Sequence, residues 1–126
     1  MLIDEIATYL QTGGVGTIGT NIFIGFQPPD SEARNCITIK PTGGLAPDVD
    51  LIGITNPTVQ ILGRGATISE AMALSQAAYN ILHGLANTDI GDNYIMFCEA
   101  LQEPTAIGQD DNNNFEISCN YLLKVR

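Results

Sequence analysis

Basic residues are scarce in this chain. Its 126 residues include only five Lys and Arg against fourteen Asp and Glu, which gives a formal net charge of −9. Proteins that bind nucleic acid regardless of sequence draw their affinity from many Lys and Arg contacts to phosphates, and anionic membranes attract proteins in the same way. The composition therefore argues against a broad nucleic-acid-binding surface and against docking on anionic membranes.

Cysteine and histidine are also few. Cys36, Cys98 and Cys119 are odd in number and far apart, without a C-x-x-C pair, and His83 is the single histidine. Neither a disulfide framework nor a zinc site is indicated, so we expect buried, reduced thiols.

Long apolar runs are absent as well. The amino end MLIDEIATYL lacks the basic start and apolar stretch of a signal peptide. No later apolar run reaches the roughly 18 residues that a membrane span needs. We therefore expect synthesis in a cytosol-like compartment and no membrane partner.

The length predicts a single domain over residues 1–126, because such a chain buries a real core but is too short for two conventional domains. Charged residues make up 15% of the chain, below the roughly 25% of an average globular protein. A surface so poor in charge is covered either by uncharged polar side chains or by a partner subunit. The composition leaves both interpretations open.

Hydrophobic periodicity predicts a short amphipathic helix over residues 2–11 and a longer helix that begins at Thr67 and ends near His83. Thr67 and Glu70 fit the T-x-x-E capping box. Apolar or alternating segments predict five strands, the last two as a hairpin: residues 21–26, 36–40, 57–62, 94–101 and 115–125.

The intervening segments 42–56, 86–93 and 102–114 are interpreted as loops or turns. This order predicts an α+β fold with a mostly antiparallel sheet of about five strands, one long helix packed across a face and a short N-terminal helix.

The long helix has two apolar sides in the sequence. One stripe, expected to face the sheet, consists of Ile68, Ala71, Met72, Ser75, Ala78, Tyr79 and Leu82. Leu74, Ala77 and Ile81 lie off this stripe, so we expect this second flank to face another subunit.

The segment VQILGRGATISEA places two glycines around Arg64 between a strand and the long helix. A dinucleotide motif needs a small residue where Ile68 stands, and a P-loop needs a lysine that neither glycine has after it. Gly63 and Gly65 are therefore interpreted as turn residues. A helix amino terminus also holds anions, so the alternative is a small-ligand or anion-binding module at the Gly63–Glu70 turn, assisted by Arg64.

No other constellation predicts chemistry. No motif places a nucleophile or carboxylate beside His83, which is interpreted as a helix-end residue, and a G-x-S-x-G elbow is absent. Two acidic pairs, Asp48 with Asp50 and Asp110 with Asp111, lack the EF-hand pattern and are interpreted as solvated loop acids. We predict no catalytic, cofactor-binding or metal site, and no enzyme.

Three segments carry a family resemblance: ITIKPTGG at 37–44, NPTVQILGRG at 56–65 and AAYNILHG at 77–84. They resemble small tailed-bacteriophage proteins known as minor capsid or tail-terminator (tail-completion) proteins. The resemblance spans most of the chain and is strongest over residues 37–43 and 56–84. Gly63 departs from it, because the family commonly has a larger apolar or β-branched residue there.

The resemblance implies a virion protein, assembled in the host cytoplasm, that forms a homo-oligomeric ring, usually a hexamer, at the head–tail junction. Such a ring sits on the end of the tail tube, stops its polymerisation and contacts the head connector. The implied partners are copies of itself, the tail tube protein and the head-connector protein, while DNA passes through without specific binding. No cofactor is implied.

Five residues are candidates for contacts in such a ring. An acidic bore would keep passing DNA from sticking, because like charges repel. Asp48, Asp50, Asp110 and Asp111 are the candidates for this role or for subunit contacts. Arg64 is the candidate for an interface ion pair or for an ion pair that fixes a loop.

Overall fold

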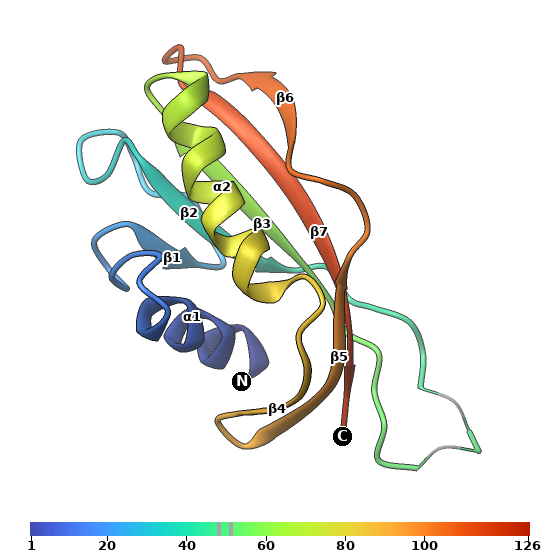
Figure 1. Ribbon diagram of the computed structural model, residues 1–126. Helices are drawn as coiled ribbons and strands as arrows, with labels where there is room; N and C mark the ends of the chain where they lie inside the picture. The colour runs from blue at the N-terminus through green and yellow to red at the C-terminus, as the bar shows by residue number, and fades with distance from the viewer. Residues whose placement is uncertain (48, 51) are drawn as a thin grey trace.

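A computed structural model describes residues 1–47, 49–50 and 52–126 (Figure 1). Its two helices are α1 (Leu2–Thr12) and α2 (Ile68–Leu82). Its strands are β1 (Ile22–Ile24), β2 (Cys36–Pro41), β3 (Thr58–Gly65), β4 (Ala86–Ile90), β5 (Asn93–Ala100), β6 (Thr105–Gln109) and β7 (Phe115–Val125). No helix in the described residues is long and apolar enough to cross a membrane.

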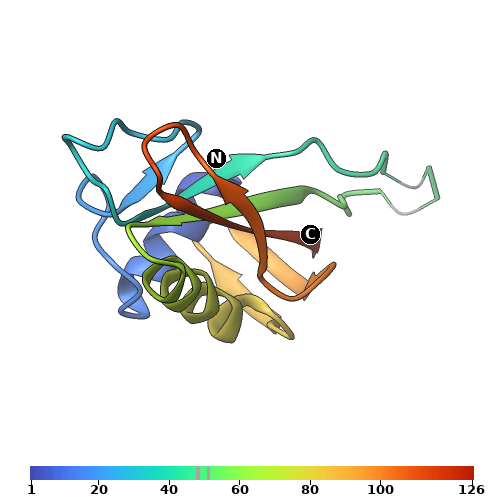
Figure 2. The same cartoon turned by 90° about the horizontal axis from the view of Figure 1, so that it is seen from above.

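The strands form one sheet in the order β1-β2-β3-β7-β5-β4, and β6 also pairs with β7. Only β1 and β2 are parallel; the other ladders are antiparallel. The long strand β7 binds β3 along one edge, and its other edge binds β6 first and then β5. Both helices lie on the same face of the sheet (Figure 2), so the mixed fold is as predicted.

The predicted strand number is too low. Residues 86–93 and 102–114 were interpreted as turn and loop, but they contain β4 and β6. In β6 all five residues are exposed, and in β4 only Ile90 is buried. Neither strand therefore shows the apolar alternation that reveals a half-buried strand in a sequence. The predicted pairing of residues 94–101 with 115–125 is confirmed as the β5–β7 ladder.

The main core lies between the helices and the sheet. From α1 it takes the helically spaced Ile6 and Leu10, and from the central strands Ile61 and Tyr121, all four fully buried. A second, smaller cluster lies on the opposite face, where Phe23, Ala33 and Cys36 pack together. Alternation within each strand separates the two clusters, because successive side chains point to opposite faces.

The interpretation of Gly63 and Gly65 as turn residues is wrong. Both lie inside β3, paired with Ile117 and Phe115 of β7, and neither adopts a positive φ. They are glycines because α2 lies directly on them. A Cβ on Gly63 would collide with Ser75 Oγ, and one on Gly65 would lie 2.6 Å from the Ala71 nitrogen. The reversal between strand and helix is left to the two residues Ala66 and Thr67.

At the start of α2, one of the two hydrogen bonds of the predicted capping box is formed. Thr67 Oγ1 accepts a hydrogen bond from the Glu70 amide at 3.2 Å, as predicted. The Glu70 carboxylate does not complete the box, because it accepts from Asn35 Nδ2 at 3.3 Å. The cap therefore also ties the helix start to the segment that precedes β2.

The sheet-facing side of α2 is made by small residues. Ala71, Ser75, Ala78 and Leu82 are buried as the stripe predicted. The prediction that Ile68 belongs to this buried stripe is wrong, because the residue lies on the first turn of α2 and is 47% exposed. On the second flank, Leu74 and Ile81 pack partly against the protein's own core.

The three cysteines are buried and free, as predicted. Burial raises the pKa of each thiol, and that of Cys98 reaches about 12. The thiols therefore stay protonated across the physiological range, and the fold shields them from reagents in solution.

Gly63→Ala tests the close contact of α2 with β3. We expect the free energy of unfolding to fall by about 1–3 kcal/mol, because the added methyl group overpacks the helix–sheet contact. Urea denaturation measures the change. In the matched background, Ser75→Ala removes the colliding hydroxyl, whose oxygen has no hydrogen-bond partner among the described residues. In the Ser75→Ala background, Gly63→Ala should lower the free energy of unfolding by less than in the wild type. An equal loss in both backgrounds would contradict the collision between a Cβ at position 63 and Ser75 Oγ.

Thiol reactivity tests the burial of the cysteines. At pH 8 the folded protein should release almost no thionitrobenzoate from Ellman's reagent, because the raised pKa values keep the thiols protonated and buried. In denaturant, three thiols per chain should react. Rapid reaction of even one thiol in the folded protein would contradict the described core.

Candidate functional site

Arg64 lies in β3 between the two glycines, and its side chain takes the face of the sheet opposite to α2. It is only 4% exposed. Its Nε donates to the Arg34 carbonyl at 3.1 Å, and its Nη2 donates to the Ala33 carbonyl. Its Nη1 lies 3.6 Å from Asp30 Oδ1. Arg64 thereby ties the loop between β1 and β2 to the sheet of its own chain.

Asn114, which the sequence did not single out, joins this loop to the β6–β7 turn. The residue is fully buried. Its Nδ2 donates to both carboxylate oxygens of Asp30 at 2.8 Å and to Asp110 Oδ2 at 3.1 Å. Its Oδ1 accepts from Arg34 Nε at 2.6 Å. We call the group of Asp30, Arg34, Arg64, Asp110 and Asn114 the polar cluster.

Asp110 organises the turn itself. Its Oδ1 accepts from the backbone amides of Asn112 and Asn114, both at 2.9 Å. These hydrogen bonds, above all that from the Asn114 amide, lower the pKa of the Asp110 carboxyl. The carboxylate is thus ionised at neutral pH and fully engaged inside its own chain.

The chemistry of the polar cluster is structural. Two carboxylates face two guanidinium groups and one amide, so its charges are matched internally and each acid already accepts hydrogen bonds. The contact between Asn114 and Asp30 spans 84 positions in the sequence. No local motif could have revealed it, whereas the lone Arg64 in an apolar strand was a visible signal.

The other predicted acids are spread over the molecule. Asp48 lies outside the described residues, and Asp50 and Asp111 are exposed. The loop that carries Asp50 and the β6–β7 turn that carries Asp110 and Asp111 lie at opposite ends of the sheet (Figure 1). The structure therefore does not gather these acids within one subunit, and their roles in an interface stay predictions, like that of Arg64.

The segment 42–57 is called the arm; its described residues, 42–47, 49–50 and 52–57, project beyond the sheet (Figures 1 and 2). Its base is held by the bridges Leu45↔Asn56 and Thr55↔Val125. Beyond the base, Val49 is 89% exposed and Ile52 is 96% exposed. Burial of these two aliphatic side chains against a partner would remove their apolar surface from water.

The face of the sheet without helices is the second notable surface. Because Ile39, Ile61 and Tyr121 point into the main core, their neighbours along each strand point away from it. This open face carries Lys40, Thr58, Gln60, Asn120, Leu122 and Lys124, all only partly buried.

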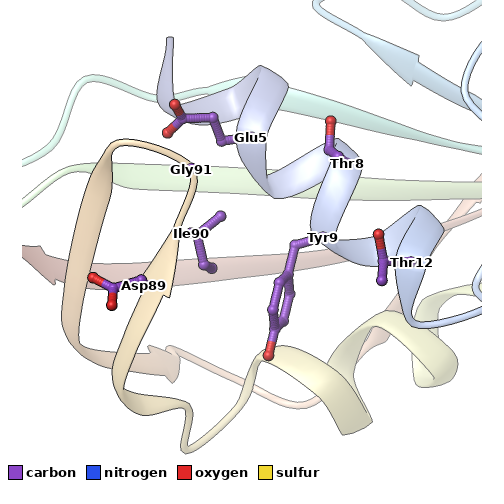
Figure 3. Close-up of a pocket in the computed structure, with 7 residues that line it drawn as sticks. All are labelled: Glu5, Thr8, Tyr9, Thr12, Asp89, Ile90 and Gly91. Atoms are coloured by element: carbon purple, nitrogen blue, oxygen red, sulfur yellow. The ribbon is translucent and has the colours of Figure 1, made fainter.

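A small hollow lies between α1 and β4 (Figure 3). It measures about 200 Å³, which is below the roughly 300–1,000 Å³ of typical small-molecule sites. Glu5 at its rim accepts hydrogen bonds from the Asp92 amide and from Asn93 Nδ2, and so fixes the β4–β5 turn against α1. Asp89 points away from Tyr9 (Figure 3), so the hollow does not converge on a ligand.

His83 is likewise used by the fold. Its ring stacks on Tyr79 with centroids 4.9 Å apart, and its Nδ1 accepts from the Ala100 amide at 3.0 Å. The residue thus caps α2, as the sequence predicted, and joins the helix end to β5.

Comparison with known proteins gives a family and a structural neighbour. The model of a family described as bacteriophage tail terminator protein matches residues 9–126. A chain in the virion of a native gene transfer agent particle has a similar fold, with a TM-score of 0.60 and 16% sequence identity. The similarity covers 92% of this chain and 83% of that one. No curated protein sequence matches the chain.

Arg64→Met tests the polar cluster. The change removes the cation that pairs with Asp30 and the donor to two backbone carbonyls, so we expect a loss of roughly 3 kcal/mol in the free energy of unfolding. Lys40→Met is the matched control, because Lys40 lies on the same face without an ion pair among the described residues and should change stability by less than about 0.5 kcal/mol. Equal effects of the two changes would contradict the structural role of Arg64.

Proposed function

The chain belongs to the bacteriophage tail terminator family, and we propose that it forms a ring, of six subunits, that caps the tail tube and joins it to the head connector. Membership of this family makes the protein a structural component of the virion. The ring, its number of subunits and its direct contacts with the tube and connector proteins form the proposal.

The observation that carries the proposal is the exposed arm. Val49 and Ile52 stand almost entirely in water in the isolated chain, and Leu45 at the base of the arm is 64% exposed. Several exposed apolar side chains on one segment favour a contact with another protein, because burial against a partner removes them from water. An oligomer therefore accounts for the arm, and the chain's low content of charged residues agrees with this interpretation.

A ring also requires two different surfaces on each subunit. In a head-to-tail contact one surface meets a different surface of the next copy, and the assembly closes when the rotation between copies completes a circle. The arm and the end of the open face where β5 and β7 run together are two such surfaces, and the helices leave both uncovered (Figure 2).

Passage of DNA through the ring is compatible with the charge of the chain. With a net charge of −9, each subunit repels a polyanion on average, so the DNA is not held. Asp50 and Asp111 are exposed and available to a lumen or an interface. The carboxylate of Asp110 already serves the polar cluster.

Anion binding at the Gly63–Glu70 turn has less support. Arg64, the cation it relied on, points to the face opposite to α2 and binds Asp30. The amides of Ala66 and Glu70 already donate to Asn35 Oδ1 and Thr67 Oγ1. We therefore propose no ligand for this turn.

Purified protein should assemble into a ring in a concentration-dependent manner. Size-exclusion chromatography with light scattering should give about six times the 13.4 kDa mass of the chain, and negative-stain electron microscopy should show particles with a central opening. The hexamer is the expected state because it is the one that the family resemblance implies.

Thermal shift with phosphate separates the two functions. A ring-forming protein without an anion site keeps its Tm when phosphate replaces chloride at equal ionic strength. A monomer at every concentration, with a Tm that rises with phosphate as mass action requires, would refute the ring and restore the anion-binding module.

A further inference from the structure

The distribution of basic residues on this protein is uneven. Of the five Lys and Arg residues, Arg34 and Arg64 are engaged in the polar cluster. The other three, Lys40, Lys124 and Arg126, belong to β2 or to the end of β7, and alternation places them on the open face. None of these three forms an ion pair among the residues that the structure describes.

Two of these cations lie beside aromatic side chains where β5 and β7 run together. Lys124 is paired with Phe97, which is 42% exposed, and Arg126 lies over the Tyr94 ring, 4.8 Å from its centroid. Leu122 continues the same face, paired with Glu99. We call Tyr94, Phe97, Leu122, Lys124 and Arg126 the basic patch.

The tip of the arm has the complementary chemistry. It exposes Val49 and Ile52, and between them Asp50 is exposed as well. The arm, residues 42–57, contains no Lys or Arg, and its sequence includes a second acid, Asp48. An apolar, acidic tip matches an apolar, basic patch in both hydrophobicity and charge.

The arm does not reach the patch of its own chain. Backbone hydrogen bonds between Thr55 and Val125, 2.8 and 2.9 Å long, hold the base of the arm beside the patch. From there the arm leads away from the sheet (Figures 1 and 2), and its tip side chains stay in water. An arm tip that binds this patch must therefore belong to another copy of the chain.

We infer that the arm tip of one subunit docks on the basic patch of a second copy of this chain. The inference rests on the proposed ring and identifies the contact that builds it: Val49 and Ile52 pack on Phe97 and Leu122, and the Asp50 carboxylate pairs with Lys124 or Arg126. One arm for each patch gives the head-to-tail contact that a closed ring needs.

Charge reversal followed by mixing tests the contact. Asp50→Lys places a cation opposite Lys124 and Arg126, and Lys124→Asp places a carboxylate in the patch opposite Asp50, so each variant alone should raise the dissociation constant of the assembly by about tenfold or more. In an equal mixture every lysine arm can meet an aspartate patch, and every wild-type arm a wild-type patch. Light scattering should then recover the wild-type mass, in particles of alternating composition.

Two further variants secure the interpretation. Lys40→Asp makes the same charge change on the same face outside the basic patch and should leave assembly unchanged. Ile52→Ser should weaken assembly without loss of stability, because Ile52 is 96% exposed in the folded chain. Circular dichroism melting of each variant checks that the fold is retained.

The outcomes separate the contact from the ring itself. Single variants that assemble like the wild type, or an equal mixture that stays dissociated like the single variants, would overturn the inference and leave the ring standing. Wild-type protein that remains monomeric at every concentration would overturn the ring, and the arm contact with it.

Discussion

The contact on which most of the structure depends is the direct approach of α2 to β3 at Gly63 and Gly65. With no Cβ on either glycine, the backbone of the helix reaches the strand, and Ala71 and Ser75 fill the space that larger side chains would take. Strand alternation then leaves only one place for the residue between them. Arg64 must lie on the opposite face, where it organises the loop before β2.

This arrangement divides the molecule into two sides of different chemistry. The helix side is closed by the main core and carries Glu5 and Glu70 at its surface, whereas the three cations outside the polar cluster lie on the sheet side, together with the acid Glu99. At one end of the sheet the polar cluster covers the open face with two loops. At the other end no loop covers it, and there the arm begins. The surface left for a partner is thus the part of the sheet that the cluster does not reach.

The sequence predicted the elements that carry strong periodicity and missed those formed by pairing alone. Both helices and the five strands with apolar runs or apolar alternation could be predicted, since burial in the core leaves a pattern in their side chains. Strands β4 and β6 could not, because backbone hydrogen bonds to β5 and β7 define them while their side chains remain exposed. For the same reason Arg64 was visible in the sequence and Asn114 was not: a charge inside an apolar strand is conspicuous, whereas a buried amide acquires its role only through partners far away in the chain.

The position of Gly63 separates the residues that stabilise the fold from those that remain exposed for contacts in the proposed assembly. A strand-to-helix joint built on glycine turns would have left Arg64 at the surface, free to serve an interface. With both glycines inside β3, the Arg64 guanidinium group binds groups of its own chain. The side chains available for contacts in the proposed ring are exposed ones, which contribute little to the stability of the fold. Asp50, Val49 and Ile52 are such groups, and their replacement changes the surface without disturbing the core. In the proposed ring, the stability of the subunit and the affinity between subunits would therefore depend on separate residues, so that each could be altered while the other is held constant.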